Sequence, residues 1–431
     1  MTVQSIFMTG EAGYHNLGDE GMALASASRL RRYFPDAQLV ATGFDPLGAV
    51  LRQQAKIVPW PLTQYSLPFT HTSGRIRKIG RKLGASEDFL DPAGRPFDRI
   101  FAKQYRDNPT FRDVLQTMER ADLMFDMGHG GLTDVFDPFT LCFFYYLAGR
   151  LGKPLFLSGQ SVGPLWRRRS MRMVRSALQY AHTVGLRDKG VSYDVLVKQV
   201  GIDPGSTRLI EVGDDTLDLA PEEPARGIVE EPIRRLLTGG QFFAIQWRST
   251  DYAGKFAATE HLVPLVEAVG YLYRQTGLIP VFVPMSWEAS GDVLAAVRVR
   301  DFIQDAFPCE VVWHALTPAQ AKWLLGQAKF GIGLSYHFNV FLLSQGLPSI
   351  ALYTNDYYDI KARGVFAAFG LTATPPAYRP GLVDDVAFRE CAEVALAWDE
   401  KQRTVALDAA RAQRDRWHAA FRQFMLDHGL T

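Results

Sequence analysis

The sequence lacks the features that mark most specialised classes of protein. With 47 basic and 46 acidic residues among 431, its net charge is +1, so no overall charge draws it toward nucleic acid or a membrane. Its three cysteines, Cys142, Cys309 and Cys391, show neither metal-site spacing nor a disulfide framework, which fits a reducing cytoplasm. The longest apolar run, residues 139–148, is too short to span a bilayer, and the first ten residues do not read as a signal peptide. These absences predict a globular cytoplasmic chain.

The sequence also has no internal repeat and no low-complexity tract, and it is too long for one hydrophobic core. Short apolar strands alternate with helices in both halves, which predicts two parallel sheets. Residues 220–240 lose this periodicity and contain three prolines. We therefore predict an α/β protein with two Rossmann-like domains facing a cleft. The predicted segments are an N-terminal domain (1–222), a linker (223–240), a C-terminal domain (241–400) and a C-terminal helix (401–431).

Two glycine-rich turns follow predicted strands of the first half. They are residues 10–20 and Gly128-His129-Gly130-Gly131. Neither is a Walker A loop or a GxGxxG motif, but glycines let the backbone approach a ligand and the following helix N-terminus offers N–H groups to an anion. A structural role stays open for the first turn, in which Asp19 would cap the helix starting near Glu20. We interpret His129 as a solvated loop residue.

In the second half, polar side chains follow predicted strands. Arg248 comes directly after one strand, and His337 ends another in Ser335-Tyr336-His337. The carboxyl ends of parallel strands share one edge of a sheet, where ligands bind. An arginine there suits a carboxylate or phosphate, and a histidine titrates near neutral pH and can transfer protons. An interdomain salt bridge for Arg248 and a structural role for His337 stay open. For Asp214 with Asp215 we favour a turn cap over a metal site.

A series of short motifs runs through most of the chain. They are Asn16-x-Gly18-Asp19-Glu20, Gly128–Gly131 with Asp134, Gln160-Ser161-x-Gly163-Pro164, Arg187-Asp188-x-x-x-Ser192, Gly213-Asp214, Arg248, His337, Gly346-x-Pro348, Lys361 and Gly364. Their order and spacing resemble the polysaccharide pyruvyltransferase family from about Phe7 to Leu371. Members of this family resemble two-domain (GT-B) glycosyltransferases and transfer the pyruvyl group of phosphoenolpyruvate to two hydroxyls of a sugar, forming a ketal. Where the family usually has Arg-Leu-His, this chain has Ser335-Tyr336-His337.

The positions of these residues, taken together with the resemblance, give the following expected site residues. His337 and Arg248 are the expected catalytic residues. The expected donor-binding residues are Lys361, Arg187, Ser335, Gln246, Gly128, Gly130 and Gly131. The expected acceptor-binding residues are Tyr14, Asn16, Asp19, Glu20, Gln160 and Trp287. No cofactor and no metal is expected, phosphoenolpyruvate is the co-substrate, and the acceptor is a bacterial surface polysaccharide or its lipid-linked precursor.

Two other functions stay open: a GT-B-type glycosyltransferase that uses a nucleotide sugar, and a catalytically silent binding protein. Retaining glycosyltransferases of this type commonly carry two glutamates eight positions apart, and residues 331–364 contain no glutamate, which disfavours them. The basic segments 74–83 and 166–169 are either solvated or contact an anionic membrane at the cytoplasmic surface. No nucleic-acid partner is expected.

Overall fold

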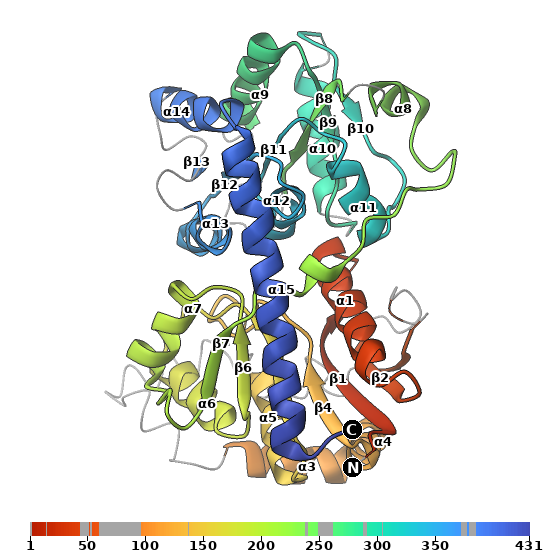
Figure 1. The fold of residues 1–431 in the computed structure, drawn as a ribbon, viewed down its shortest axis with the longest axis vertical. Helices are drawn as coiled ribbons and strands as arrows, with labels where there is room; N and C mark the ends of the chain where they lie inside the picture. The colour runs from red at the N-terminus through yellow and green to blue at the C-terminus, as the bar shows by residue number, and fades with distance from the viewer. Residues whose placement is uncertain are drawn as a thin grey trace. The chain divides into compact units, whose positions relative to one another are not determined.

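The computed structural model describes residues 2–13, 15–43, 51, 54–59, 96–136, 138–237, 240–248, 262–287, 291–303, 305–371, 377–378 and 385–431. The chain divides into two compact units. Unit 1 comprises Met1–Gly13, Ser26–Val212 and Trp417–Thr431, and unit 2 comprises Tyr14–Ala25 and Gly213–Arg416. Each unit is built on a parallel sheet with helices between its strands, which confirms the predicted α/β class (Figure 1).

Within the described residues, the sheet of unit 1 has seven strands in the order β3-β2-β1-β4-β5-β6-β7, all paired in parallel. The chain order reverses between β1 and β4, which is where a doubly wound sheet binds its ligand. The strands are β1 (Ser5–Ala12), β2 (Gln38–Gly43), β3 (Lys56–Pro59), β4 (Leu123–Asp126), β5 (Leu155–Gln160), β6 (Thr183–Leu186) and β7 (Arg208–Glu211).

Helices cover both faces of this sheet because successive side chains of its strands point to opposite faces. On one face, Phe7 of β1 packs against Phe144 of α5 (Phe139–Arg150). On the other, Phe156 of β5 contacts Phe421 of the C-terminal helix α15 (Glu400–His428). Other helices among the described residues of this unit are α3 (Pro96–Asp107), α4 (Pro109–Arg120), α6 (Arg168–Leu178), α7 (Val191–Asp194) and the π-helical η3 (Val195–Val200).

The part of unit 2 that the structure describes contains a sheet of six strands in the order β10-β9-β8-β11-β12-β13, again all parallel. Its strands are β8 (Phe242–Gln246), β9 (Ile279–Phe282), β10 (Glu310–Val311), β11 (Gly331–Gly333), β12 (Ser349–Leu352) and β13 (Ala377–Tyr378). Its helical segments are η4 (Asp215–Asp218), α8 (Glu231–Leu237), α9 (Leu262–Thr276), α10 (Asp292–Ile303), α11 (Pro318–Leu325), α12 (Tyr336–Leu343), α13 (Asp356–Ala368) and α14 (Asp385–Leu396).

Local sequence signals fix several of these helix starts. The capping box of α11 pairs the Thr317 side chain with the Gln320 backbone and the Gln320 side chain with the Thr317 backbone, and Pro318 occupies the first helical position. Asn355 caps α13 by accepting a hydrogen bond from the Tyr358 amide. Such caps satisfy N–H groups that have no partner within the helix.

Three boundaries differ from those predicted. Helix α1 (Leu17–Tyr33) starts three residues before Glu20, and its first part belongs to unit 2 while its second part belongs to unit 1. The last residues of α15, from Trp417 on, also belong to unit 1. The segment predicted as a linker, 223–240, contains helix α8.

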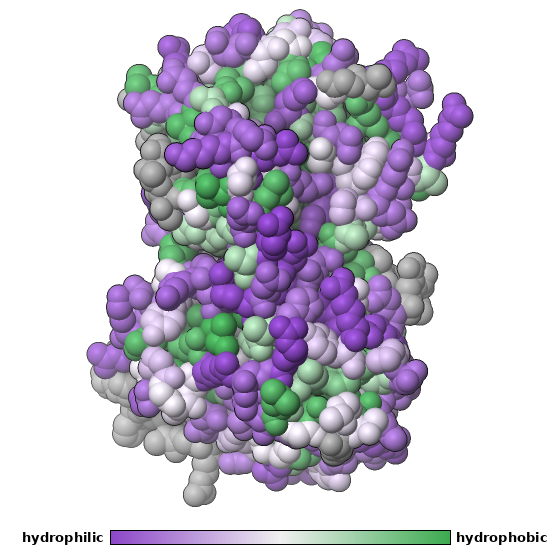
Figure 2. Space-filling view, in the orientation of Figure 1, coloured by the Kyte–Doolittle hydropathy of each residue, from purple (hydrophilic) through white to green (hydrophobic). Residues whose placement is uncertain are grey.

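In Figure 2 the strip occupied by α15 is mostly hydrophilic, as expected for a helix with one face turned to solvent. No helix within the described residues is both long enough and apolar enough to cross a membrane.

Candidate functional site

In unit 2, Gln246 and Asp292 join the ends of three neighbouring strands. Gln246 ends β8, and its Nε2 donates to Asp292 Oδ2 at 2.7 Å. Its Oε1 accepts from the backbone N–H groups of Leu334 (3.0 Å) and Ser335 (2.7 Å), which follow β11. Asp292 opens α10 after β9 and is fully buried. This pair holds the loops that follow β8, β9 and β11 in fixed relative positions.

Asp292 also holds Arg248. Its Oδ1 accepts from Arg248 Nε at 2.9 Å, and both side chains are buried. The alternative role predicted for Arg248 was a salt bridge between domains. Arg248 does form a salt bridge, but its partner Asp292 belongs to the same unit. Oδ2 of Asp292 additionally accepts from the Met285 and Ser286 N–H groups, at 2.7 and 3.1 Å. A guanidinium carries five N–H donors, so the pairing with Asp292 is compatible with binding a substrate anion.

His337 lies in the first turn of α12 and not at the end of β11 as predicted, because the helix starts at Tyr336. Its imidazole packs directly against Gly18 in the first turn of α1. A Cβ at residue 18 would lie 2.7 Å from His337 Cε1 and closer still to Nδ1, which is tighter than real Cβ contacts. The glycine at position 18 is therefore required by the histidine ring.

Asp214 faces the other nitrogen of the same ring. Its Oδ2 lies 3.4 Å from His337 Nε2, and both side chains are buried. Its Oδ1 accepts from the Thr216 N–H (2.9 Å) and Oγ1 (2.5 Å), so Asp214 also caps η4. The preceding Gly213 has φ +79°, and a Cβ there would lie 2.8 Å from Gln413 Cβ. The predicted turn cap is thus confirmed for Asp214, and no group of three metal-ligating side chains occurs among the residues that the structure describes.

The segment before α1 joins the same group of loops. Asn16 forms an antiparallel bridge with Ser286, the Leu17 N–H donates to the Met285 carbonyl at 2.8 Å, and the Trp287 N–H donates to the His15 carbonyl at 3.1 Å. The Gly18 N–H donates to Asn16 Oδ1 at 3.0 Å. Asn16, and not Asp19, therefore provides the side-chain cap at the start of α1.

These contacts close a ring around His337. The first turn of α1 touches its imidazole, the loop after β9 pairs with the residues before α1, and Asp292 and Gln246 tie that loop to Arg248 and to Ser335. Two helix N-termini, those of α1 and α12, meet at the histidine. Helix N-termini carry partial positive charge and favour bound anions.

The other predicted residues of unit 2 are placed as follows. Ser335 is the N-cap residue of α12, but its hydroxyl makes no capping bond. Glu20 is buried and Asp19 partly exposed in the first turn of α1. Lys361 Nζ lies 4.3 Å from the centre of the Tyr357 ring, one turn earlier on α13. Tyr14 and the basic segment 74–83 lie outside the described residues.

In unit 1, the turn with Gly128, Gly130 and Gly131 follows β4 and carries His129, which is fully buried; the prediction of a solvated residue is wrong. Its Nδ1 accepts from the Gly131 N–H at 3.1 Å, so its ring proton sits on Nε2 and points to Asp126 Oδ2 at 3.0 Å. The Tyr145 hydroxyl donates to the same oxygen. The sequence gives no sign of this burial because Tyr145 lies on another element.

Gln160 and Arg187 lie at the ends of β5 and β6. Gln160 is fully buried, its Nε2 donates to the Met127 carbonyl at 3.4 Å, and its Oε1 has no hydrogen-bond partner among the described residues. Arg187 is buried and its Nε donates to the Gly159 carbonyl at 2.8 Å. Asp188 accepts hydrogen bonds from the Ser192 N–H and from the Ser192 hydroxyl. Gln160, Arg187 and Asp188 belong to unit 1, whereas the ring around His337 belongs to unit 2.

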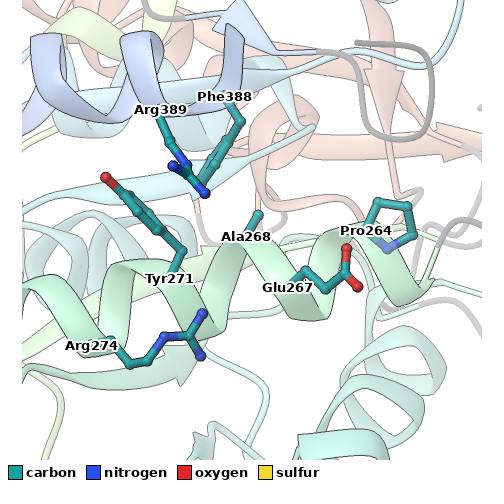
Figure 3. Close-up of a pocket in the computed structure, with 7 residues that line it drawn as sticks. All are labelled: Pro264, Glu267, Ala268, Tyr271, Arg274, Phe388 and Arg389. Carbon is teal, nitrogen blue, oxygen red and sulfur yellow. The ribbon is translucent and has the colours of Figure 1, made fainter. Parts of the chain in front are cut away.

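A separate pocket of about 270 Å³ lies between α9 and α14 (Figure 3). Arg389 lies 5.7 Å from the centre of the Tyr271 ring, and Phe388 packs edge-on against the same ring. The described residues that line this pocket include none of the predicted site residues. We therefore assign the candidate site to the ring around His337.

Asp292 belongs to the candidate site, but the sequence did not single it out. It begins α10, and an aspartate at a helix start commonly serves only as a cap. Its contacts with Gln246 and Arg248 join residues 46 and 44 positions apart, which no local pattern signals. A polar residue at each of several strand ends was the available clue.

Comparison with solved structures places the fold among GT-B glycosyltransferases and epimerases. The Anabaena protein HepE, crystallised with UDP and glucose, has a TM-score of 0.54 at 12% identity, with 99% of each chain covered. The UDP-GlcNAc 2-epimerase from Neisseria meningitidis, bound to UDP-GlcNAc, has a TM-score of 0.51 at 10% identity, covering 96% of this chain and 100% of its own. A Glycyrrhiza uralensis protein, UGT73P12, has a TM-score of 0.51 at 12% identity, covering 96% and 91%.

Sequence comparison identifies the family. The family model for polysaccharide pyruvyl transferase matches residues 16–356, which include Asn16, Gly18, Asp214, Arg248 and His337. No curated protein sequence matches the chain significantly. The chain belongs to the polysaccharide pyruvyl transferase family, as the motif order predicted.

Proposed function

We propose that the chain transfers the pyruvyl group of phosphoenolpyruvate to two hydroxyls of a sugar, forming a ketal and releasing phosphate. The observation that carries this proposal is the ring of contacts in unit 2. It presents an imidazole, an arginine and two helix N-termini together, and phosphoenolpyruvate carries about three negative charges that suit such a site. Family membership supports the transferase class.

In the proposed reaction, His337 gives a proton to the methylene carbon of the enol phosphate, and one sugar hydroxyl attacks the neighbouring carbon and returns its proton to His337. The bond from that carbon to the phosphate oxygen then breaks, the second hydroxyl attacks the same carbon, and its proton goes to the leaving phosphate. The products are one ketal and one phosphate, and the scheme requires neither a cofactor nor a metal. His337 is the proton-transferring group, with Asp214 orienting its ring.

We assign the donor anion to Arg248 and the amides at the starts of α1 and α12. Arg248 is held by Asp292 so that its guanidinium is oriented before substrate arrives, which reduces the cost of binding. The other proposed donor contacts are Ser335, Gln246, Lys361, Arg187 and the turn of Gly128, Gly130 and Gly131. Ser335 stands where the family usually has arginine, so Arg248 carries more of the donor charge here.

The proposed acceptor is a hydroxyl-rich sugar of a bacterial surface polysaccharide or its lipid-linked precursor, met in the cytoplasm. Its proposed contacts are Tyr14, Asn16, Asp19, Glu20, Gln160 and Trp287. The buried Oε1 of Gln160 supports this assignment, because a sugar O–H would supply the hydrogen bond that the described protein groups do not. Trp287 offers an aromatic face next to the residues that precede α1.

Ligand-induced thermal stabilisation tests the donor. Phosphoenolpyruvate at one hundred times its dissociation constant should stabilise the folded state by about 2.7 kcal/mol. Arg248→Lys should weaken this stabilisation. Arg363→Lys is the matched control, because Arg363 is also ion-paired within unit 2 but exposed on α13. With a sugar acceptor present, His337→Gln should retain donor binding but release no phosphate, whereas exposed His314→Gln should behave as wild type.

The same experiment tests the alternative, a glycosyltransferase that uses a nucleotide sugar. Structural neighbours of this chain were solved with UDP or a UDP-sugar, at identities that establish only the fold. Stabilisation by a UDP- or GDP-sugar and none by phosphoenolpyruvate would overturn the pyruvyltransferase proposal. A product heavier than the acceptor by pyruvate less one water, formed with phosphate release, would establish it.

A further inference from the structure

Helix α6 of unit 1 lies in a long stretch of sequence that has basic residues but no acidic ones. From residue 138 to residue 187 the sequence contains no aspartate and no glutamate, although acidic and basic residues nearly balance over the whole chain. Helix α6 and the residue before it supply most of the basic side chains in this stretch. They are Arg167, Arg168, Arg169, Arg172 and Arg175.

The geometry of α6 separates these arginines from the core. Met173, Val174, Ala177 and Leu178 are buried in the hydrophobic core of unit 1. Arg168, Arg172 and Arg175, at positions i, i+4 and i+7, lie on the opposite face and are exposed. The helix therefore presents a continuous basic stripe to solvent.

An exposed tryptophan stands at the start of this stripe. Trp166 is 56% exposed, and the Arg167 guanidinium lies 5.9 Å from the centre of its ring. Its backbone is held firmly: buried Asp134 accepts hydrogen bonds from the Trp166 and Arg167 N–H groups, each at 2.7 Å, and from Ser170 Oγ at 2.5 Å. These hydrogen bonds hold the backbone of Trp166, and its large amphipathic side chain lies exposed at the surface beside the arginines.

We propose that Trp166 and the arginine face of α6 form a docking surface for an anionic phospholipid membrane. Tryptophan prefers the membrane–water interface, where its ring is buried and its N–H stays hydrated. Each basic residue near an anionic leaflet strengthens binding by about fivefold. Nucleic acid is the less favoured partner because its binding domains are usually strongly basic, whereas this chain has a pI of about 7.7. The proposal does not depend on the proposed activity.

Vesicle co-sedimentation of the full chain tests the surface. We expect binding to phosphatidylcholine vesicles that contain phosphatidylglycerol, weaker binding as salt rises, and little binding to phosphatidylcholine alone. The triple variant Arg168→Gln, Arg172→Gln, Arg175→Gln should bind about a hundredfold more weakly. Trp166→Ala should weaken the binding that remains at high salt. Circular dichroism of each variant verifies folding.

The matched control removes three arginines from the exposed side of α15: Arg403→Gln, Arg411→Gln, Arg416→Gln. It has the same net charge as the α6 variant and should bind vesicles as wild type does. Equal loss in both variants, no binding to anionic vesicles, or tighter binding to double-stranded DNA than to vesicles would overturn the proposal.

Discussion

Gly18→Ala provides a direct test of the contact between α1 and His337. In the interior of a helix, replacing glycine by alanine ordinarily stabilises by about 0.5–1 kcal/mol, because glycine loses more freedom on folding. Here the added methyl would lie 2.7 Å from His337 Cε1 and closer to Nδ1, so the imidazole must move. Overpacking of this kind costs about 1–3 kcal/mol. The variant should therefore be less stable than wild type by about 1 kcal/mol.

A double-mutant cycle isolates this effect. In the His337→Ala background the ring is gone, so Gly18→Ala should stabilise by about 0.5–1 kcal/mol, giving a coupling energy of about 1–3 kcal/mol. Gly21→Ala, one turn further along α1, is the matched control. Its nearest neighbour would be Pro318 Cβ at 3.2 Å, so it should show little coupling to residue 337. Urea unfolding at equilibrium measures all of these variants, and additive effects of Gly18→Ala and His337→Ala would refute the contact.

Three further predictions follow from buried groups. Asp292→Asn removes the buried carboxylate that pairs with Arg248 and should destabilise by about 3–5 kcal/mol in urea unfolding, whereas Asp359→Asn, which breaks an exposed pair, should cost at most about 1 kcal/mol. Burial, with the neighbouring His182, lowers the pKa of His428, so the unfolded chain binds a proton at this histidine before the folded chain does as pH falls below 6.5. The melting temperature should therefore fall in this pH range, and it should fall less in His428→Gln. Burial raises the pKa of the Cys309 thiol to about 12, so iodoacetamide at pH 8 should modify Cys309 only after unfolding, and native modification would contradict this.

Much of the fold could be predicted because buried parallel strands are short apolar runs separated by helices. The sequence predicts strands at residues 183–186 and 208–211, which are the bounds of β6 and β7, and an apolar helix through Arg150, where α5 ends. Helix starts were less accurate. The start of α12 was missed by two residues because Tyr336 and His337 read as the polar end of a strand, although Ser335 already has the extended backbone of an N-cap.

The candidate site could be predicted as a set of residue types but not as a set of contacts. Arg248 and His337 stood out because they follow strands, and the sheet edge brings such residues together. Their partners Asp292 and Asp214 lie far away in sequence, and nothing local shows that a carboxylate will face either one. The burial of His129 likewise depends on Tyr145, which lies on helix α5 and contacts the His129 ring.

The exchange of segments between the units has a consequence for synthesis on the ribosome. Unit 1 is made almost entirely before unit 2, yet the aromatic side chains that cover one face of its sheet come from Trp417 onward. The Arg29 guanidinium of α1 lies 4.3 Å from the centre of the Trp417 ring, so this part of α1 gains its packing partner only when the last residues have been synthesised. A fragment that ends at Val212 should therefore expose Phe125 and Phe156 to water and be prone to aggregate. We expect unit 1 to reach its native fold only after synthesis of the whole chain is complete.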